Sequence, residues 1–420
     1  MSGNNRQFPF FRRRRTDRVT ARLAPSDLTA LELDSTQLLA REPRNTDLKQ
    51  AEKLITGKRV MITGAGGTIG SELVRQVAQF DPELLILIDN SEFNLYEIDM
   101  ELKRTRPGLN VVSMLVDVCR LEHLNPVFEN AAPHFVLHAA AYKHVPIVER
   151  NPCAAALTNV LGAKNVFDAA VRTGCEAVVF ISSDKAVNPT SFMGATKRIA
   201  ELYAQSLDIA QTGTRFVTVR FGNVLGSTGS VAPLFQRQIA QGGPITVTHP
   251  DVQRYFMTTR EAVQLVIQAA SLSDENGRVM THDGRIFVLD MGEPVRIVTL
   301  AERMIEAAGL TPNEDIKIVY TGLRPGEKLF EEIFHDLEKL VRTGVDGILL
   351  ASPSMIDLPL LKPRLEDVVQ YALSCQRNEL EEAVHHLVPE FRPDPQSAQP
   401  DAIASLGVRR KSGKPIQNDR

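Results

Sequence analysis

The sequence is poor in cysteine, and this shortage limits the kinds of protein that it can encode. Four cysteines are spread over 420 residues, without a Cys-x-x-Cys pair or a spacing suited to a Cys/His metal site. This distribution is typical of reduced thiols rather than of a disulfide framework or a zinc site. We therefore expect no metal centre and a cytoplasmic location. The cysteines are Cys119, Cys153, Cys175 and Cys375.

Long hydrophobic runs are also missing. The longest apolar stretches, such as Leu84–Ile88 and Val179–Ile181, have the length of strands, whereas a membrane-spanning helix needs roughly 18 apolar residues. No apolar segment typical of a secretory signal follows Met1. These absences predict a chain without a transmembrane segment.

A general excess of positive charge is absent, because the formal net charge is -3. Proteins that bind nucleic acid usually carry a basic excess or patch, so we expect no nucleic-acid partner. The exception is an arm over residues 1–33, in which Arg12–Arg15 follow Phe10 and Phe11. This arm is predicted to be solvated and disordered. An alternative is peripheral contact with an anionic membrane surface, where arginines and aromatic side chains both bind.

From residue 57 the sequence alternates between strand-like and helix-like patterns. This alternation predicts a doubly wound parallel sheet, the Rossmann type of α/β fold, over residues 57–240. The predicted strands are Arg59–Thr63, Glu83–Asp89, Val111–Val116, Phe135–Ala139, Ala177–Ser182 and Phe216–Arg220. The predicted helices are Ile69–Ala78, Leu95–Lys103, Ala154–Val171 and Thr196–Leu207.

The remaining segments are predicted to be a linker region with a helix (34–56), a smaller mixed α/β substrate domain (241–391) and a disordered tail (392–420). The tail is rich in Pro, Ser, Gln and Lys and has no apolar periodicity. The elements predicted in the smaller domain are strands near Ile245–Thr248 and Arg285–Asp290, and helices near Thr259–Leu272, Ile297–Ala308 and Leu365–Cys375.

A glycine-rich turn follows the first predicted strand and opens a helix. Glycines in this context permit a tight turn and a close approach of the backbone to a pyrophosphate at the helix N-terminus. We therefore expect this turn to bind the diphosphate of a dinucleotide. The residues predicted to do so are Gly64, Gly67, Thr68, Ile69 and Gly70.

Asp89 ends the second predicted strand and strengthens this prediction. Its carboxylate can accept both hydroxyls of an adenosine ribose and would repel a 2′-phosphate, so NAD is favoured over NADP. Asp117 and Val118, after the third strand, are candidates for the adenine edge, although Asp117 is equally suited to a turn or a helix cap. Ala139 and Ala140 are small enough to let the backbone approach the nicotinamide.

Three polar residues, Ser183, Asp184 and Lys185, follow the fifth predicted strand. Open α/β sheets bind ligands outside the carboxyl ends of their strands, so this position favours a catalytic group over an exposed ion pair. Met193 and Lys197 lie four residues apart at the start of a helix and share a face. Lys197 is predicted to bind the nicotinamide ribose.

Several motifs together resemble one protein family. They are the Gly64–Gly70 turn, His138–Pro146, Ser183–Pro189, Met193–Lys197, Arg220–Gly226, Arg254–Met257 and Leu323–Lys328. The chain resembles the polysaccharide-biosynthesis branch of the extended short-chain dehydrogenases from about Arg41 to Pro393. Within that branch it is most similar to UDP-N-acetylglucosamine 4,6-dehydratases of configuration-retaining type. Members often carry additional membrane helices, and the chain resembles the catalytic half alone.

The resemblance implies a dehydration with bound NAD: C4 of the sugar is oxidised, water leaves from C5 and C6, and the hydride returns to C6. It assigns Lys185 as the base at C5 and Asp184 as the acid at the C6 oxygen. These roles require that both pKa values shift toward neutrality.

Met193 stands where most relatives have a tyrosine that takes the C4 hydroxyl proton. Methionine exchanges no protons, so this chemistry is either lost or carried out by another group. Ser183, Asp184 and Lys197 are candidates for a relay through water.

The resemblance also implies the substrate contacts. It assigns Asn223 and Arg324 to the UDP diphosphate and Glu327 to the uridine ribose, roles that suit an arginine fork and a carboxylate. Arg254 is a second phosphate candidate, with an ion pair inside the smaller domain as the alternative. Asn159 is expected to support the site structurally.

Lys143 and His144 are candidates for contact with the hexose, although His144 is equally suited to a structural role. Related enzymes commonly form dimers or larger rings, so we expect a homo-oligomer. Two other functions stay open: a UDP-N-acetylglucosamine 4-epimerase, for which an Asp184–Lys185 pair has no evident use, and a catalytically silent NAD-binding scaffold.

Overall fold

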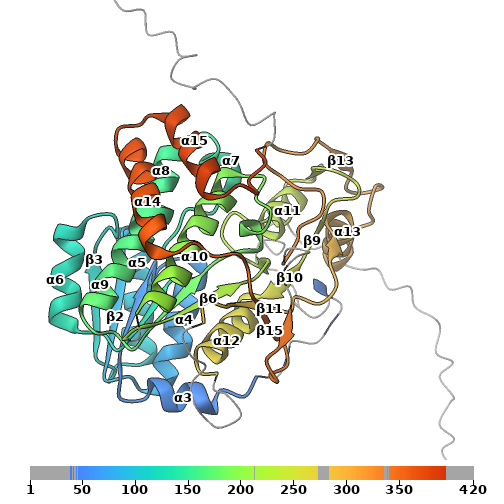
Figure 1. The fold of residues 1–420 in the computed structure, drawn as a ribbon. Coiled ribbons are helices and arrows are strands. Elements are labelled where there is room, and N and C mark those ends of the chain that lie inside the picture. The colour runs from blue at the N-terminus through green and yellow to red at the C-terminus, as the bar shows by residue number, and fades with distance from the viewer. Residues whose placement is uncertain are drawn as a thin grey trace, which may run out of the picture.

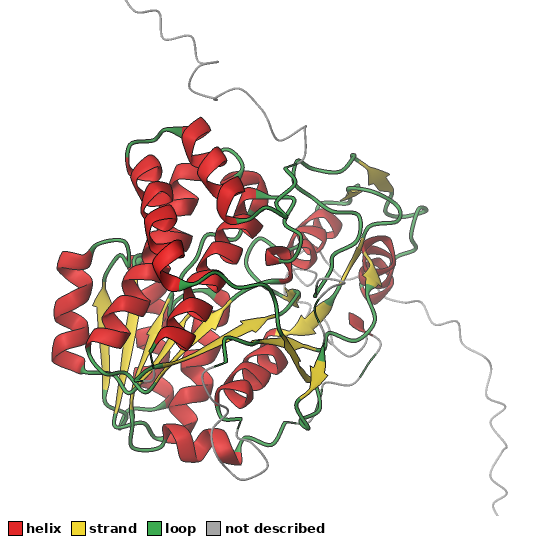
Figure 2. Cartoon of the chain, viewed as in Figure 1, coloured by secondary structure: helices red, strands yellow, loops and turns green. Residues whose placement is uncertain are grey.

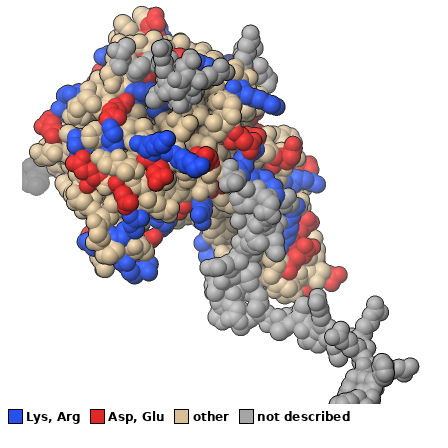
Figure 3. All heavy atoms as spheres, turned by 90° about the horizontal axis from the view of Figure 1, so that it is seen from below, with Lys and Arg blue, Asp and Glu red and all other residues tan. Residues whose placement is uncertain are grey.

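The computed structural model describes residues 38, 39, 41, 44, 46–211, 213–272, 283–334, 338 and 340–393. The predicted basic arm and its membrane contact lie outside these residues, as does the predicted tail beyond Pro393. No helix among the described residues is long and apolar enough to cross a membrane. On the face drawn in Figure 3, basic and acidic side chains are interspersed.

A nine-stranded sheet forms the centre of the fold, in the order β14-β15-β11-β6-β5-β4-β1-β2-β3 (Figure 1). The seven neighbouring strands β3, β2, β1, β4, β5, β6 and β11 run parallel. At the edge, β15 pairs antiparallel with β11 and β14 pairs antiparallel with β15. The predicted Rossmann-type fold is therefore confirmed. The strands are β1 (Arg59–Thr63), β2 (Leu84–Asp89), β3 (Val111–Leu115), β4 (Phe135–His138), β5 (Ala177–Ile181), β6 (Arg215–Arg220), β11 (Ile286–Leu289), β14 (Val341–Arg342) and β15 (Ile348–Ala351).

Helices cover both faces of the sheet (Figure 2). Because side chains alternate along a strand, Ile62 of β1 packs in one hydrophobic cluster and Met61 in another. The first cluster holds helices α3 (Lys49–Ile55), α4 (Thr68–Val77), α5 (Glu92–Thr105) and α12 (Thr259–Ala270). The second holds α6 (Leu121–Ala131), α8 (Pro152–Ala156), α9 (Gly162–Arg172), α10 (Phe192–Ala210), α14 (Leu358–Leu373) and α15 (Arg377–Leu387).

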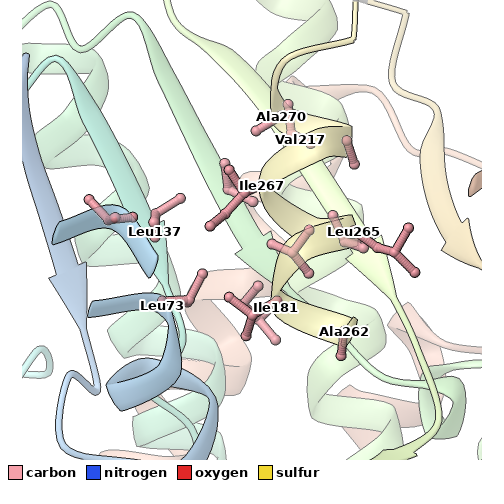
Figure 4. Close-up of a cluster of buried hydrophobic side chains, with 14 of the residues drawn as sticks. Leu73, Leu137, Ile181, Val217, Ala262, Leu265, Ile267 and Ala270 are labelled. Atoms are coloured by element: carbon pink, nitrogen blue, oxygen red, sulfur yellow. The ribbon is translucent and has the colours of Figure 1, made fainter. Parts of the chain in front are cut away.

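The first cluster joins elements that are distant in sequence. Figure 4 shows Leu73 of α4 and Leu265 of α12 on the same side of the sheet as Leu137 and Ile181, which come from β4 and β5. On the other face, α14 and α15 pack against α8 and α10. The C-terminal helices therefore belong to the same body as the sheet.

A π-helical turn over Leu157–Leu161 interrupts the helix that the sequence predicted to be continuous, between α8 and α9. Asn159 lies in this turn and is buried. Its amide accepts from the Tyr142 backbone N–H at 2.8 Å and donates to the Tyr142 carbonyl and the Thr196 hydroxyl, each at 3.0 Å. The hydrogen bonds of Asn159 thus connect the loop after β4 to α10.

A smaller region packs beside the carboxyl end of the sheet. Its core joins α11 and α13 with the parallel pair β8 and β13, and Leu38 and Leu39 pack against it. The elements are β7 (Asn223–Leu225), α11 (Val231–Ala240), β8 (Ile245–Val247), β9 (Gln253–Arg254), β10 (Phe256–Thr258), β12 (Val295–Arg296), α13 (Ile297–Ala307) and β13 (Ile318–Tyr320).

Residues after position 240 contribute to both regions. The strand predicted at Arg285–Asp290 is β11, which pairs with β6 in the main sheet and is buried along its whole length. The helix predicted at Thr259–Leu272 is α12, which packs against α4. A buried central strand needs neighbours on both sides, which explains why β11 lies in the large sheet and not among the short strand pairs of the smaller region. The domain boundaries given above stay predictions.

Candidate active site

The glycine-rich turn connects β1 to α4 at the carboxyl end of the sheet. Gly64 has a φ of 66°, and a Cβ there would lie 2.7 Å from the backbone nitrogen of Ala140. A Cβ at Gly70 would lie 1.8 Å from the carbonyl oxygen of Gly64. Only glycine permits both the left-handed backbone and these close approaches. The turn after β1 therefore lies directly against the loop after β4.

The first turn of α4 has features that suit an anion. Gly67 precedes the helix without a side-chain cap, and the first turn holds no acidic residue. Thr68 and Ile69 begin the helix, and the Thr68 hydroxyl lies 3.4 Å from that of Thr228. Backbone N–H groups at a helix N-terminus bind phosphate readily. These residues fit the diphosphate of a dinucleotide.

Asp89, the last residue of β2, connects the turn after β1 with the loop after β2. Its carboxylate accepts the backbone N–H of Gly66 at 2.9 Å and that of Ser91 at 2.8 Å. Asp117 accepts the N–H of Cys119 at 2.9 Å, as the turn interpretation expects. The structure places both carboxylates at the carboxyl edge of the sheet, after β2 and β3, while their contacts with adenosine stay a prediction.

The end of β4 is tightly packed. The Ala139 N–H donates to the Thr63 carbonyl at 3.1 Å, which holds the loop against β1. His138 is buried, with its Nδ1 atom 2.7 Å from the Thr63 hydroxyl. Burial lowers the pKa of His138 to about 3, so its ring is neutral. His138 is therefore no proton donor at neutral pH.

Ser183, Asp184 and Lys185 form a short turn after β5. The Ser183 hydroxyl donates to Oδ1 of Asp184 at 2.8 Å, and Nζ of Lys185 lies 3.1 Å from the same oxygen. Nζ also contacts Oδ1 of Asn223 at 3.2 Å and Oε2 of Glu331 at 2.8 Å. The turn after β5 thus meets β7 and the segment that follows Arg324.

The surroundings raise the pKa of both predicted proton carriers, Asp184 and Lys185. Burial, reinforced by the charge of Glu331, raises the pKa of Asp184 to about 7. Burial by itself would lower the pKa of Lys185, but the charges of Asp184 and Glu331 outweigh it and the pKa is raised. Asp184 therefore shifts as an acid requires. The shift of the Lys185 pKa toward neutrality that a base role requires is absent from this arrangement, because two carboxylates bind its ammonium group.

Met193 and Lys197 lie in the N-terminal part of α10, the helix that follows this turn in the sequence. Met193 is buried in the second hydrophobic cluster, and its backbone lies at the helix start, where Glu149 accepts the N–H of Phe192 at 2.7 Å. Nζ of Lys197 donates to the Ile181 carbonyl at 2.8 Å and lies 4.8 Å from the centre of the Phe180 ring. Burial lowers the pKa of Lys197 to about 8. The pKa of Lys197, unlike that of Lys185, therefore moves toward neutrality.

A cavity opens beside the Asp184–Lys185 turn, with about 660 Å³ of space between its walls including its open mouth. Residues of the main sheet region and of the smaller region both line this cavity. Six of the predicted site residues lie together there. These are Asp184, Lys185, Asn223, Arg254, Arg324 and Glu327. Lys143 and His144 are exposed and do not line it.

Arg254 makes two ion pairs inside the cavity wall, with Oε1 of Glu327 at 3.0 Å and with Oε1 of Glu331 at 3.0 Å. The structure therefore shows the ion-pair alternative that was predicted for Arg254. Glu327 also accepts the Arg324 backbone N–H at 3.1 Å and the Thr248 hydroxyl at 3.1 Å. These contacts position the loop that carries Arg324.

Glu331 was missed by the sequence analysis. It follows the Leu323–Lys328 motif in a Leu-Phe-Glu-Glu stretch that has no distinctive spacing, and it meets Lys185 across 146 positions of sequence. A buried support was also missed: Glu201 pairs with Arg220 at 2.6 Å and accepts the Ser182 hydroxyl at 2.6 Å. Local patterns carry no signal for such long-range contacts.

Comparisons with known proteins give consistent relatives. The family described as polysaccharide biosynthesis protein matches residues 60–353. The capsular polysaccharide biosynthesis protein CapD of Staphylococcus aureus is 44% identical over 349 residues, which are 81% of this chain and 56% of CapD. The chain therefore spans about half the length of this relative.

Two relatives with a named reaction are equally similar. An inverting UDP-N-acetylglucosamine 4,6-dehydratase of Campylobacter jejuni is 32% identical over 72% of this chain and 85% of the enzyme. A UDP-glucose 4-epimerase of Rickettsia canadensis is 32% identical over 70% of this chain and 85% of the enzyme. Sequence identity therefore does not distinguish the dehydratase relative from the epimerase relative.

Solved structures agree with the fold. The X-ray structure of Pen from Bacillus thuringiensis has 34% sequence identity and a TM-score of 0.62, covering 72% of this chain and 89% of Pen. The UDP-glucose 4-epimerase of Thermus thermophilus, solved in complex with NAD, has 21% identity and a TM-score of 0.54, covering 66% and 90%. The second likeness concerns the fold alone.

Proposed function

The chain belongs to the polysaccharide biosynthesis protein family, and from this premise we propose that it is an NAD-dependent UDP-N-acetylglucosamine 4,6-dehydratase of configuration-retaining type. The observation that carries the proposal is the buried Asp184, whose raised pKa suits an acid, beside Lys185 in a cavity lined by Arg254 and Arg324. Elimination of water needs an acid and a base together, and each contributes roughly 10²–10⁴ in rate.

The chain supplies a place for each part of the substrate. Arg324 and Asn223 bind the diphosphate, and Glu327 accepts from the uridine ribose. When the diphosphate enters, Arg254 exchanges one of its two carboxylate partners for a phosphate oxygen, because an arginine fork binds either group. The hexose then lies against the Asp184–Lys185 turn.

The Gly64–Gly70 turn would hold the diphosphate of the dinucleotide, Asp89 would accept from its adenosine ribose, and Lys197 would bind its nicotinamide ribose. When bound, the dinucleotide supplies the hydride acceptor for C4 and the hydride donor for C6. Ala139 and Ala140 would let the backbone approach the nicotinamide, because their side chains are small.

Asp184 donates its proton to the departing C6 hydroxyl, and Lys185 accepts the proton from C5. The second step requires a neutral lysine, so the hexose must separate Nζ of Lys185 from at least one of its two carboxylate partners. Asp184 was also a predicted candidate for the C4 hydroxyl proton, but it already holds the proton that it donates, so Ser183 and Lys197 are the remaining candidate acceptors. Met193 has no part in proton transfer.

A 4-epimerase is the second candidate, since an epimerase relative is as similar as a dehydratase relative. Incubation of the purified chain with UDP-N-acetylglucosamine separates the two. Dehydration lowers the product mass by the mass of one water, and proton NMR of the product reports the configuration at C5. An unchanged mass with an altered C4 signal supports the epimerase, and no conversion supports an NAD-binding scaffold.

Three further statements stay proposals. We propose that the chain acts in the cytoplasm, assembles as a homo-oligomer, and provides a 4-keto-6-deoxy sugar nucleotide for a cell-surface polysaccharide. Size-exclusion chromatography with light scattering tests the assembly, and a monomer at micromolar concentration would contradict it.

A further inference from the structure

Two carboxylates face each other across the Lys185 ammonium group. Oδ1 of Asp184 and Oε2 of Glu331 contact Nζ at 3.1 and 2.8 Å. The other oxygen of Asp184, Oδ2, is buried and has no hydrogen-bond donor among the described residues. The side chain of Glu331 is within hydrogen-bonding reach of Asp184. Since both groups are acceptors when ionised, they form a hydrogen bond only if one of them holds a proton.

The cations around the pair decide which carboxylate holds this proton. Glu331 contacts two of them, Lys185 at 2.8 Å and Nε of Arg254 at 3.0 Å. Asp184 contacts one, Lys185, together with the Ser183 hydroxyl. Adjacent carboxylates rarely both ionise in a buried site, and the one with more positive neighbours stays charged. Glu331 is therefore the anion, and the proton lies on Asp184.

The other groups near Asp184 fit this distribution. A Cβ at Gly222 would lie 3.2 Å from Oδ2, so the backbone of the loop after β6 covers this oxygen and brings no charge to it. Tyr255 interacts with Asp184 electrostatically, and its own pKa is raised, first by burial and then by acidic neighbours. The Tyr255 hydroxyl donates no hydrogen bond to Oδ2 of Asp184, so it does not stabilise an aspartate anion. Glu331 is thus the acidic residue that sets the charge of Asp184.

We propose that Glu331 is a positioning residue that keeps Asp184 protonated, so that Asp184 can act as the acid in the elimination. The inference rests on the proposed dehydratase function. It makes the two halves of the site depend on each other, because Glu331 belongs to the segment that carries Arg324 and Glu327. Removal of the Glu331 charge would leave Lys185 and Arg254 to stabilise an ionised, inactive Asp184.

The test is the pH dependence of turnover in Glu331→Gln, a substitution that keeps the shape and removes the charge. Activity needs protonated Asp184, so it falls as the pH rises through the pKa of that group. In the variant we expect this fall to occur at least one pH unit lower, which is about a tenfold loss at pH 8 relative to the wild type. A purely structural role would lower the rate at every pH and would leave unchanged the pH at which activity falls.

Two further variants keep the outcome interpretable. Glu332→Gln removes the neighbouring charge, whose carboxylate contacts Asn188 and Lys328, and is expected to leave the pH of the fall unchanged. Glu331→Asp restores a carboxylate and should return the fall toward the wild-type pH. An unmoved pH dependence in Glu331→Gln, with the folded state retained, would overturn the inference.

A second readout separates this inference from the proposed function. Infrared titration without substrate should detect a protonated carboxyl band that is absent in Asp184→Asn and disappears at lower pH in Glu331→Gln. If the chain dehydrates no sugar nucleotide but the band behaves in this way, the proposed function is wrong. The inference that Glu331 keeps Asp184 protonated is then still supported. If turnover is normal and the band is insensitive to Glu331, the inference is wrong.

Discussion

The two parts of the candidate active site, the predicted cofactor end and the predicted acid–base end, are built differently. At the cofactor end, Gly64, Gly70 and Asp89 lie within one β-α-β unit and act through backbone geometry and short-range hydrogen bonds. At the acid–base end, Asp184 and Glu331 meet only because the fold brings two distant segments together. The geometry of a glycine-rich turn can thus be encoded in one short motif, whereas the protonation state of a buried carboxyl group depends on tertiary contacts.

The largest expected effect is at the acid–base end. Lys185→Met should lower dehydration by roughly 10²–10⁴, because a proton carrier is lost. NAD binding should persist, since the residues of the Gly64–Gly70 turn are untouched. Exchange of the C5 proton with deuterium from the solvent checks the role directly, and retained exchange would remove Lys185 as the base. Lys103→Met, at an exposed lysine of α5, is the control.

The next effect is at the cofactor end. Gly70→Ala places a Cβ 1.8 Å from the Gly64 carbonyl oxygen, and overpacking of this kind costs about 1–3 kcal/mol. We expect a lower thermal unfolding temperature and no further stabilisation by added NAD. Gly108→Ala is the matched control, because nothing lies within 4 Å of its Cβ position. Equal behaviour of the two variants would contradict the role of the turn.

A smaller effect concerns Lys197, whose pKa falls from 10.5 to about 8 through burial. Between these values the unfolded chain holds a proton that the folded chain has released, so stability rises with pH in this window. The slope is at most about 1.4 kcal/mol per pH unit. Urea unfolding at several pH values measures it, and Lys197→Met should abolish this contribution. A slope that survives the substitution belongs to another group.

The smallest effect is expected for Met193→Leu. The residue is buried and carries no proton, and volume-conserving apolar exchanges usually cost less than about 1.5 kcal/mol. Turnover should stay within a few-fold of the wild type. A loss of more than about tenfold in a stably folded variant would show that the thioether contributes more than packing.

Local sequence patterns predicted the cofactor end well. The strand, the glycine turn and the helix occur where the periodicity placed them, and the predicted Asp184 and Lys185 lie together in the cavity. The patterns could not predict Glu331, because its partner is 146 positions away. They likewise identified β11 as a strand without indicating that it pairs with β6, since periodicity reports burial and not the neighbour that provides it.

The five-residue π-turn over Leu157–Leu161 has a consequence for how this segment can vary in evolution. Successive residues of a helix are rotated by about 100°, so loss of one residue here would turn Asn159 away from Tyr142 and Thr196. Substitutions on the outer side leave these hydrogen bonds intact, whereas a single deletion removes all of them. The outward-facing residues of the segment can therefore change while Asn159 and the length of the segment are fixed.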